Sequence, residues 1–291
     1  MRDRTVAIIG ATGQLGRALT AALPPLGWDV RPLGHDDVEI ADRASIGRAL
    51  DPAPSVVINT AFWPGEALEP AFRVNAFGPR LLAEFCAAQG TLLVHLSTDY
   101  VFDGDANEPY HESDPTRPRS IYGLSKATGE QLVRTAAPRH LIVRVSSLLG
   151  HGGSRAKQGT NFITSLLERA ERGGPVRVVA DQLHSPTFAM DAAVAIGELL
   201  KHDVFGTVHV SNRGWCSWYE LAVKLFQFAG VTVPVAPIRL ADLPSDGPPR
   251  PRYTVLGHYA LHVAGIASPP PWEEGLQSYL AVARAERVQN R

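Results

Sequence analysis

Short apolar runs alternate with longer segments of helical periodicity along the first 150 residues of the chain. Most of these runs are apolar at successive positions and rich in β-branched residues or leucine, which is typical of strands buried on both faces. The predicted strands are Thr5–Ile9, Trp28–Leu33, Ser55–Ile58, Leu92–Leu96 and Leu141–Val145. The predicted helices between them are Leu15–Leu23, which two prolines end, and Ala67–Gln89, which Gly90 ends. Strands that alternate with helices need crossover connections, so the pattern predicts a parallel, doubly wound sheet of the α/β class.

The alternation loosens after about residue 150. The elements predicted there are helices at Asn161–Arg172 and Trp218–Phe228 and strands at Val176–Ala180 and Thr207–Ser211. The proline-rich stretch Ala236–Arg252 is predicted to be an extended loop. We therefore expect a main domain over residues 1–150 and a smaller lobe, interleaved with the main sheet, over residues 151–291.

Composition narrows the classes of function. Of 291 residues, 45% are hydrophobic and 20% charged, a balance that allows a well-packed core. The net charge of −1 gives no basic field for nucleic acid and no polybasic patch for a membrane, and no apolar run approaches the roughly 18 residues of a membrane span. Cys86 and Cys216 are too few for a disulfide framework, and no cysteine or histidine has the spacing of a metal site. We expect a cytoplasmic protein with no metal, nucleic-acid partner or membrane partner.

Three glycines follow the first predicted strand, in the stretch GATGQLG, and open a helix. Gly10 allows a tight turn, Gly13 lets the backbone approach a pyrophosphate, and Gly16 lets the helix pack against the strand. The helix N-terminus adds free N–H groups and the positive end of the helix dipole. This placement favours a dinucleotide-binding turn of the Rossmann type over a merely structural turn.

The end of the second predicted strand should decide between NAD and NADP. Asp36 or Asp37 would hold a pair of ribose hydroxyls and favour NAD, whereas Arg31 or His35 would meet a 2′-phosphate and favour NADP. Both kinds of residue are present, so the sequence leaves the choice between NADH and NADPH open.

Tyr122 and Lys126 stand four residues apart, so they share one face of a predicted helix. Composition alone would produce such a pair about one time in ten, but Thr98 ends the fourth strand at the sheet edge where ligands bind. Tyr122 can exchange a proton with a carbonyl or alcohol oxygen, and Lys126 can lower the tyrosine pKa and hold a ribose. Thr98 can donate a hydrogen bond to the substrate oxygen. With a nicotinamide cofactor, this set indicates hydride transfer to or from a carbonyl carbon.

The motifs GATGQLG, NTA, VNAFGP, STDYVFDG and YGLSKATGE together resemble those of the extended short-chain dehydrogenase/reductases. Within that group the chain is most similar to the dTDP-4-dehydrorhamnose reductases, and RVSSLLG, VVADQLHSPTF and RPRYTVL continue the resemblance over nearly the whole chain. It implies an NAD(P)-binding Rossmann domain over residues 1–150 and a mainly substrate-binding lobe over residues 151–291. The implied activity is NADPH- or NADH-dependent reduction of a nucleotide-linked 4-keto-6-deoxy sugar.

The resemblance also implies the residues of the site. Thr98, Tyr122 and Lys126 would be catalytic, with Tyr122 as the proton donor. The residues expected at the cofactor are Gly10, Thr12, Gly13, Gln14, Leu15, Gly16, His35, Glu39, Ile40, Thr60, Ala61, Phe62, Asn75, Leu96, Ser97, Tyr122 and Lys126. The residues expected at the substrate are Trp63, Thr98, Asp99, Tyr100, Ser147 and Arg250.

Departures from the family pattern lie near the sugar. The segment after Ala61 is about five residues shorter than in the family and contains a turn at Trp63-Pro64-Gly65. Ser147 stands where the family has a tryptophan that packs on the sugar, and Trp63 can fill some of that space. His184 stands where the family commonly has a small residue, and a packed or surface histidine is favoured over a substrate contact. We expect the reaction class to be retained, while the identity of the sugar stays open.

Two alternative functions follow from the same family. One is a reductase or epimerase of a different nucleotide sugar in natural-product biosynthesis. The other is a non-catalytic NADP-binding subunit, since the regulatory β subunit of methionine adenosyltransferase resembles the family too. The intact set of Thr98, Tyr122 and Lys126 disfavours the second alternative.

The remaining candidate features have ordinary structural explanations. Trp215, Trp218 and Tyr219 are predicted to belong to the core rather than to stack on a ligand. For Arg250 and Arg252, in the proline-rich stretch, a diphosphate contact competes with a solvated loop. The sequence reveals no subunit interface, and a homodimer is left open because some family members dimerise.

Overall fold

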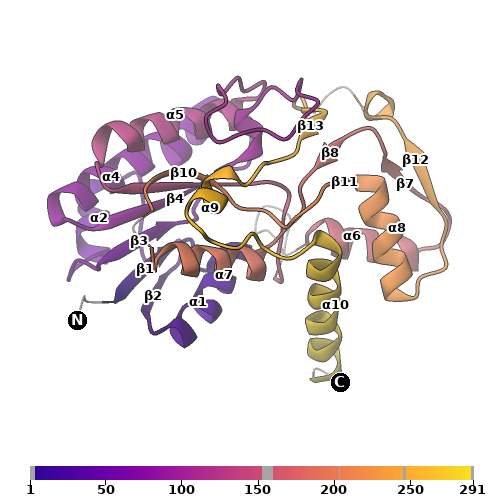
Figure 1. The fold of residues 1–291 in the computed structure, drawn as a ribbon, viewed down its shortest axis with the longest axis horizontal. Helices are drawn as coiled ribbons and strands as arrows, with labels where there is room; N and C mark the ends of the chain where they lie inside the picture. Colours follow the sequence, from indigo (N-terminus) through magenta and orange to yellow (C-terminus); the bar gives the residue numbers. More distant parts are fainter. Residues whose placement is uncertain (1–3, 153–159, 203, 245–246, 290–291) are drawn as a thin grey trace.

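The computed structural model describes residues 4–152, 160–202, 204–244 and 247–289. It is built on a parallel sheet of six strands in the order β10-β5-β4-β3-β1-β2 (Figure 1). The strands are β1 (Thr5–Ile9), β2 (Asp29–Leu33), β3 (Val56–Asn59), β4 (Leu92–Thr98), β5 (His140–Val145) and β10 (Gly206–His209). The predicted doubly wound parallel sheet is confirmed, and the predicted strands differ from the observed ones only at their ends.

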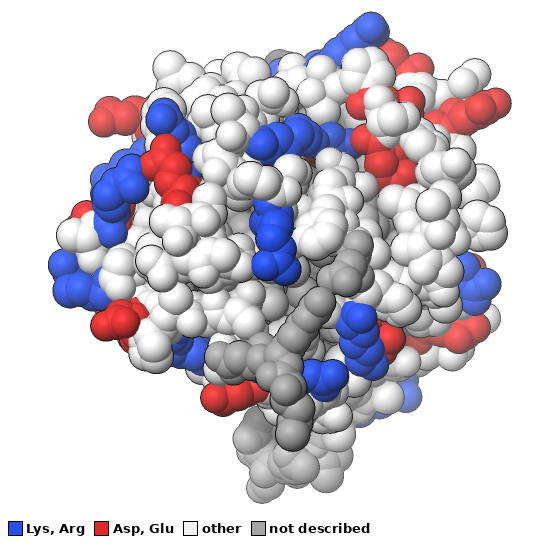
Figure 2. Space-filling view, turned by 60° about the vertical axis from the view of Figure 1, so that its left-hand side comes forward, with Lys and Arg blue, Asp and Glu red and all other residues white. Residues whose placement is uncertain are grey.

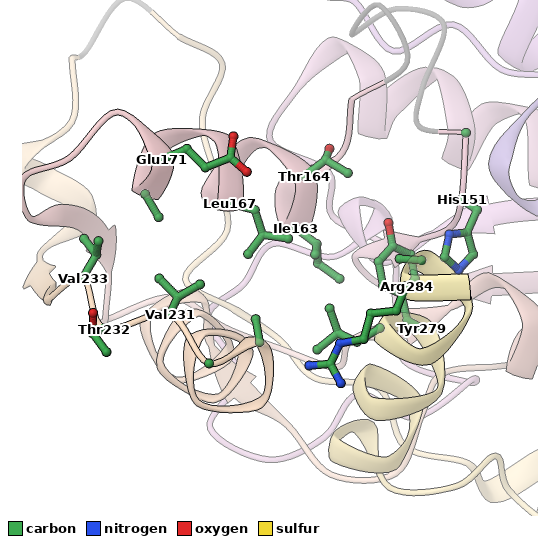
Figure 3. Close-up of a pocket in the computed structure, with 16 residues that line it drawn as sticks. His151, Ile163, Thr164, Leu167, Glu171, Val231, Thr232, Val233, Tyr279 and Arg284 are labelled. Atoms are coloured by element: carbon green, nitrogen blue, oxygen red, sulfur yellow. The ribbon is translucent and has the colours of Figure 1, made fainter. Parts of the chain in front are cut away.

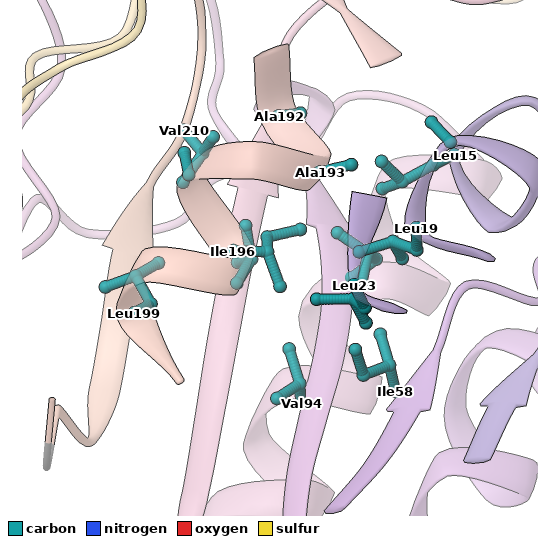
Figure 4. Close-up of a cluster of buried hydrophobic side chains, with 14 of the residues drawn as sticks. Leu15, Leu19, Leu23, Ile58, Val94, Ala192, Ala193, Ile196, Leu199 and Val210 are labelled. Atoms are coloured by element: carbon teal, nitrogen blue, oxygen red, sulfur yellow. The ribbon is translucent and has the colours of Figure 1, made fainter. Parts of the chain in front are cut away.

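Helices cover both faces of this sheet and make a three-layer sandwich (Figure 1). One face is covered by α1 (Gln14–Ala22) and α7 (Ala189–Leu199), and the other by α2 (Arg43–Ala49), α4 (Gly78–Gln89) and α5 (Ile121–Ala136). Leu19, Ile58 and Ile196 belong to a buried apolar cluster between α1, α7 and the sheet (Figure 4). Burial of such side chains contributes about 1.5–3 kcal/mol each, which holds the helices to the strands.

The predicted helix Ala67–Gln89 is interrupted. It consists of α3 (Leu68–Phe72), a π-helical turn over Arg73–Phe77, and α4. Helix α5 packs very closely on this turn, since a Cβ at Gly129 would lie 2.0 Å from the Asn75 carbonyl oxygen. The predicted helical segment is therefore confirmed over residues 68–89, with a changed helical register at the π turn, where α5 makes this contact. π turns of this kind recur at functional sites.

Most elements of the second half lie beside the main sheet in a smaller lobe, whereas α7 and β10 belong to the main sheet and its helical layer (Figure 1). The helices of the lobe are α6 (Phe162–Glu171), α8 (Trp218–Ala229) and α10 (Trp272–Gln289). Two of its small sheets have two strands each, namely β6 (Leu148–Leu149) with β9 (Thr187–Phe188) and β7 (Val176–Val179) with β12 (Val235–Ile238). The third small sheet has three strands, in which β8 (Leu183–His184) lies between β11 (Cys216–Ser217) and β13 (Tyr253–Thr254). Short elements elsewhere are α9 (Tyr259–Val263) and 3-10 turns at Pro24–Leu26, Asp99–Val101 and Leu240–Asp242. The extended loop predicted over Ala236–Arg252 is wrong at its start, because the first of these residues belong to β12, an edge strand that tolerates Pro237.

The two halves of the chain meet in the main sheet. Strand β10 comes from the second half and pairs with β5, and α7 packs against α1. The division at residue 150 stays a prediction. Within the sheet, β1 lies between β2 and β3, so the chain changes direction there. Ligands of open α/β sheets bind outside the carboxyl ends of the strands at such a point.

The surface carries no single charged field on the face that Figure 2 shows, where acidic and basic side chains are interspersed. Among the residues that the structure describes, no helix is long and apolar enough to cross a membrane.

Candidate active site

The turn after β1 depends on glycine. Gly10 has a φ of +80°, and a Cβ there would lie 2.7 Å from the Thr60 Oγ1 atom. At Gly16, a Cβ would lie 2.3 Å from the Gly10 carbonyl oxygen. Gly13 caps α1 without a side-chain hydrogen bond, so among the described residues no cap side chain occupies the N–H groups at the positive end of the helix. This arrangement fits the pyrophosphate of a dinucleotide.

A hollow of about 600 Å³ lies beside this turn. Thr12 and Arg17 line one part of it, and the loop residues 34–37 line another. The Arg31 guanidinium does not line the hollow, because it donates hydrogen bonds to two main-chain carbonyl oxygens after α2, at 3.2 and 2.8 Å. Arg17, which the sequence pattern did not single out, does line the hollow, where its Nε atom donates to the Thr12 carbonyl oxygen at 2.8 Å. Its only sequence signal is its position one helical turn after Gly13.

Other residues expected at the cofactor lie around the ends of β1, β2 and β3. The Thr60 hydroxyl donates to the Ile9 carbonyl oxygen at 2.8 Å, which ties the end of β3 to the glycine turn. Glu39 pairs with Arg73 at 2.9 Å, and Ile40 is buried in the core under α4. Their expected positions near adenine stay a prediction.

Gln14 differs from its neighbours in the turn because its side chain is engaged. The Gln14 Oε1 atom accepts a hydrogen bond from the Gly150 N–H group at 2.7 Å. The start of α1 is thereby joined to the segment after β6, where the second half of the chain begins.

Tyr122 and Lys126 lie in the first two turns of α5, opposite the end of β4. The Lys126 ammonium donates to the Leu96 carbonyl oxygen of β4. The Tyr122 ring lies between those of Tyr100 and Phe62, with centroid distances of 6.0 and 6.2 Å. The sequence prediction that the ends of β4 and α5 meet is confirmed by these contacts.

Three features hold the start of α5 in place. The Ser120 hydroxyl accepts a hydrogen bond from the Gly123 N–H group at 3.0 Å and caps the helix. Glu66 accepts hydrogen bonds from the N–H groups of Ile121 and Tyr122, at 2.7 and 3.4 Å. At Gly123, a Cβ would lie 2.2 Å from a main-chain oxygen of the segment after β4, so only glycine permits this approach. Glu66 was not predicted, because it is 55 residues from the helix that it caps.

Burial shifts the pKa values of the two catalytic candidates in opposite directions. Burial raises the pKa of Tyr122 above its ordinary value, while a hydrogen bond with Thr98 lowers it and the charge of Asp99 raises it. Burial lowers the pKa of Lys126 to about 8, and the charge of Glu130 opposes that shift. The expected lowering of the tyrosine pKa by the ammonium is not found, because desolvation dominates and the ammonium donates to a main-chain carbonyl.

Two residues expected at the cofactor make structural contacts. Asn75 accepts from the Trp63 N–H group at 2.7 Å and donates to the Trp63 carbonyl and the Ser125 hydroxyl, both at 2.9 Å. The Ser97 hydroxyl donates to Glu130 of α5 at 2.6 Å. Both side chains thus position α5 or the Trp63 turn, and a direct contact with the cofactor stays a prediction for each.

The residues predicted at the sugar differ in burial: Thr98 and Asp99 are buried, Tyr100 and Ser147 are half-buried, and Trp63 and Arg250 are exposed. Asp99 is buried, and burial raises its pKa although hydrogen bonds from Ser146, Thr254 and Thr98 lower it. The Ser146 hydroxyl lies 2.7 Å from Asp99. Ser147 has a φ of +45°, in the left-handed region that favours glycine. Strain of this kind is concentrated at functional sites.

Comparison with known proteins places the chain in a family. The model of the family described as the RmlD substrate binding domain matches residues 4–285. The chain belongs to this family. The spore coat polysaccharide biosynthesis protein SpsK of Bacillus subtilis is 38% identical over 281 residues, which cover 94% of this chain and 96% of the relative. The dTDP-4-keto-6-deoxy-D-glucose reductase of Streptomyces niveus is 38% identical over 297 residues, which cover 98% and 99%.

A solved structure has the same architecture. The dTDP-4-dehydrorhamnose reductase of Bacillus anthracis, in complex with NADP, superposes with a TM-score of 0.89 at 34% identity, covering 97% of this chain and 99% of the other. The predicted resemblance to dTDP-4-dehydrorhamnose reductases and the predicted Rossmann-type fold are both confirmed.

In this member of the RmlD family, a further hollow of about 610 Å³ lies away from the predicted site. It is formed by α6, the loop after α8 and α10, with Ile163, Val231 and Arg284 among its lining residues (Figure 3). No residue predicted to bind cofactor or substrate lines it, so its size does not mark it as the active site.

The aromatic cluster of this family member divides in two. Trp218 and Tyr219 pack against the core of the lobe, as predicted. Trp215 is 54% exposed, so the prediction that it belongs to the core is wrong. It lies before β11, outside the helix whose periodicity suggested its burial. His184 is 1% exposed, so it is a packed rather than a surface histidine, and the exposure does not test a substrate contact.

Proposed function

We propose that the chain catalyses the NADPH- or NADH-dependent reduction of a nucleotide-linked 4-keto-6-deoxy sugar, as a reductase of the dTDP-4-dehydrorhamnose reductase type. The observation that supports the proposal is the hydrogen bond between Thr98 and Tyr122, with the Lys126 ammonium bound to the carbonyl of Leu96, two residues before Thr98. The confined glycine turn after β1 supports the binding of a dinucleotide. When bound, the nicotinamide supplies the hydride that the sugar carbonyl carbon accepts.

Side chains of this site donate the proton, stabilise the developing charge and bind the ribose. The Tyr122 hydroxyl donates its proton to the carbonyl oxygen as that oxygen becomes an alcohol. Its raised pKa keeps the hydroxyl protonated at neutral pH, so Tyr122 has a proton to donate. Thr98 stabilises the developing negative charge by a hydrogen bond, and Lys126, charged below about pH 8, adds a positive charge to the site and holds the ribose. The rings of Phe62 and Tyr100 contact the Tyr122 ring edge-on and hold it in position, and Phe62 is itself 45% exposed.

The catalytic candidates and the cofactor turn agree with the family, whereas the sugar end departs from it. Ser147 stands at the position of the sugar-packing tryptophan, and Trp63, 40% exposed, lies in the shortened segment. These two positions favour a second candidate, the reduction or epimerisation of a different nucleotide sugar. A cytoplasmic location and a homodimer are predictions from the sequence that accompany the proposal.

The test combines a panel of nucleotide sugars with one substitution. Purified protein should oxidise NADPH or NADH when given a dTDP-4-keto-6-deoxy sugar, followed by the loss of absorbance at the nicotinamide band. Tyr122→Phe should lower kcat by about 10²–10⁴-fold, the usual share of general acid catalysis. Undiminished turnover in Tyr122→Phe would contradict the role of Tyr122 as the proton donor. Cofactor binding without turnover of any sugar would favour the non-catalytic NADP-binding subunit instead.

A further inference from the structure

His184 has two ring nitrogens without a hydrogen-bond partner. The residue is 1% exposed, and both its Nδ1 and its Nε2 atoms are buried and unpartnered among the described residues. Leaving a buried donor or acceptor unsatisfied destabilises a fold, and native structures do so rarely. An apolar side chain of similar volume would avoid that loss, so packing alone does not explain a histidine at this position.

The surroundings of His184 are aromatic. Its ring stacks on Trp218, with 4.0 Å between the ring centroids and 26° between the ring planes. The Phe162 ring in turn contacts the Trp218 ring, with 4.3 Å between their centroids. Burial lowers the pKa of His184 to about 3, so the imidazole is neutral at physiological pH. A neutral imidazole has one N–H donor and one acceptor nitrogen, which together match a hydroxyl group or a phosphate oxygen with its bound proton or water.

Strand pairing connects His184 with the predicted sugar end. His184 and Thr254 are register partners in the parallel pair of β8 and β13, so their side chains point to the same face of that small sheet. Thr254 hydrogen-bonds Asp99, which follows Thr98 at the end of β4. Thr254 therefore connects His184, its neighbour in the small sheet, with the buried Asp99 carboxylate next to Thr98.

A second set of contacts leads from the same ring to Tyr122. The Trp218 Nε1 atom donates to the Gln182 Oε1 atom at 3.1 Å. Gln182 also hydrogen-bonds Tyr100, whose ring lies 6.0 Å from that of Tyr122. Both routes from His184 thus end at the site where the sugar carbonyl would be reduced.

We propose that His184 is a substrate-binding residue, whose ring nitrogens hydrogen-bond an oxygen of the nucleotide sugar and help to select which sugar is bound. The proposal rests on the proposed function of the site. Trp218 is half-buried and stacks on the His184 ring, so the proposal requires the Trp218 side chain to shift when the sugar binds. Side-chain rearrangements of this size are common on binding. The oxygen belongs either to a hydroxyl of the sugar or to the diphosphate, and these sources can be separated by experiment.

The first experiment measures steady-state kinetics and thermal stability for His184→Leu and His184→Gln. We expect His184→Leu to raise KM for the dTDP-4-keto-6-deoxy sugar about tenfold, with kcat and the KM for NADPH within about twofold and with Tm unchanged or higher. His184→Gln keeps a donor and an acceptor and should retain KM within about threefold. Cys216→Ala is the matched control, since Cys216 is the antiparallel register partner of His184 in β11 and should lower Tm without changing KM.

The second experiment measures binding of dTDP and of the dTDP sugar by calorimetry. If the diphosphate is the partner, the Kd of dTDP rises with the KM in His184→Leu, and if a sugar hydroxyl is the partner, only the Kd of the dTDP sugar rises. Unchanged Kd and KM in His184→Leu, whatever the change in Tm, would show that His184 does not bind the nucleotide sugar and would overturn the proposal. A wild-type protein that binds the dTDP sugar but does not turn it over would contradict the proposed function and still allow this comparison of Kd values. A wild-type protein that binds neither dTDP nor the dTDP sugar would overturn both.

Discussion

At the cofactor end of the site the shape is made by backbone, and at the sugar end it is made by side chains. Gly10 and Gly16 hold the first turn because any side chain there would strike main-chain or β-strand atoms. The predicted sugar end instead has a buried carboxylate, Asp99, which hydrogen-bonds Ser146 and Thr254 from two separate segments. The first end is rigid and common to many dinucleotide-binding folds, whereas the second changes whenever one buried side chain changes.

This contrast explains where the chain agrees with its family and where it departs. A backbone turn tolerates few substitutions, so the stretch GATGQLG follows the family pattern. Side chains that line a site can be exchanged without loss of the fold, so the predicted departure from the family at Ser147 is compatible with the same architecture. We therefore expect members of the family to share the position of hydride transfer and to differ in the sugar that they bind.

The largest effect is expected where the backbone is most confined. In Gly16→Ala, the added methyl group would lie 2.3 Å from the Gly10 carbonyl oxygen and 2.6 Å from the Ala11 Cα atom, so the turn has to move. We expect a loss of about 2–3 kcal/mol in the free energy of unfolding and a rise of at least tenfold in KM for NADPH. Urea unfolding and steady-state kinetics measure both.

The matched control for Gly16→Ala is Gly47→Ala. Gly47 lies within α2, and a Cβ there would meet nothing within 4 Å. Because alanine is the better helix former, this variant should gain about 0.5–1 kcal/mol without a change in KM. Equal effects of the two substitutions would contradict the confined turn.

The next largest effect is expected on the pH dependence of kcat/KM, which Lys126 should control. Lys126 has a pKa of about 8, below its ordinary value of 10.5, because burial disfavours the charged form. As the pH rises through 8, the folded protein loses this charge, and we expect kcat/KM to fall about tenfold per pH unit above that point. Below pH 8 the buried ammonium destabilises the fold relative to the unfolded chain, and this effect disappears above about pH 10.5, when both states are neutral.

The pH profile of Lys126→Met separates this group from others. Without the ammonium, activity should be low at every pH and show no step near pH 8. A wild-type step that persists near pH 8 in this variant would assign the titration to another residue. Denaturant unfolding at pH 7 should show Lys126→Met at least as stable as the wild type, because a buried charge has been removed.

The same contrast governs what sequence reasoning could find. The strands of the main sheet were predictable because each is a continuous apolar run, and the glycine turn was predictable because all its parts lie within seven residues. The π turn at Arg73–Phe77 was not predictable, because helical periodicity does not register a close contact with α5. Trp215 was misplaced because the periodicity of α8 was extended beyond the start of that helix.

At the site, Thr98, Tyr122 and Lys126 could be connected from the sequence by strand order and helical spacing. Glu66, which caps α5, and Thr254, which bonds Asp99, could not be connected. Their partners are far away along the chain, and a lone carboxylate or hydroxyl carries no local pattern. Only the folded chain shows which polar side chains meet.

A smaller effect should separate the two cofactors. Arg17 lines the hollow beside the glycine turn, whereas Arg31 is engaged by main-chain carbonyls elsewhere. We expect Arg17→Ala to raise KM for NADPH about tenfold, because a charge-assisted contact with the 2′-phosphate is lost, and to leave KM for NADH nearly unchanged. Arg31→Ala is the control and should change neither value. A loss for NADPH in Arg31→Ala alone would reverse the assignment.

The smallest effect tests whether the sugar end stores strain that the cofactor end avoids by using glycine. Ser147 has a φ of +45°, which costs a residue with a Cβ about 1 kcal/mol. Ser147→Gly should therefore raise the free energy of unfolding by up to about 1 kcal/mol, whereas Ser147→Ala keeps the Cβ and should give no gain. Denaturant unfolding of both variants measures the difference, and equal stabilities would mean that the strain is absent. If Ser147 also supports the sugar, Ser147→Gly should lower kcat/KM for the nucleotide sugar about twofold to threefold despite its greater stability, because the strained residue is held in place for binding rather than for folding.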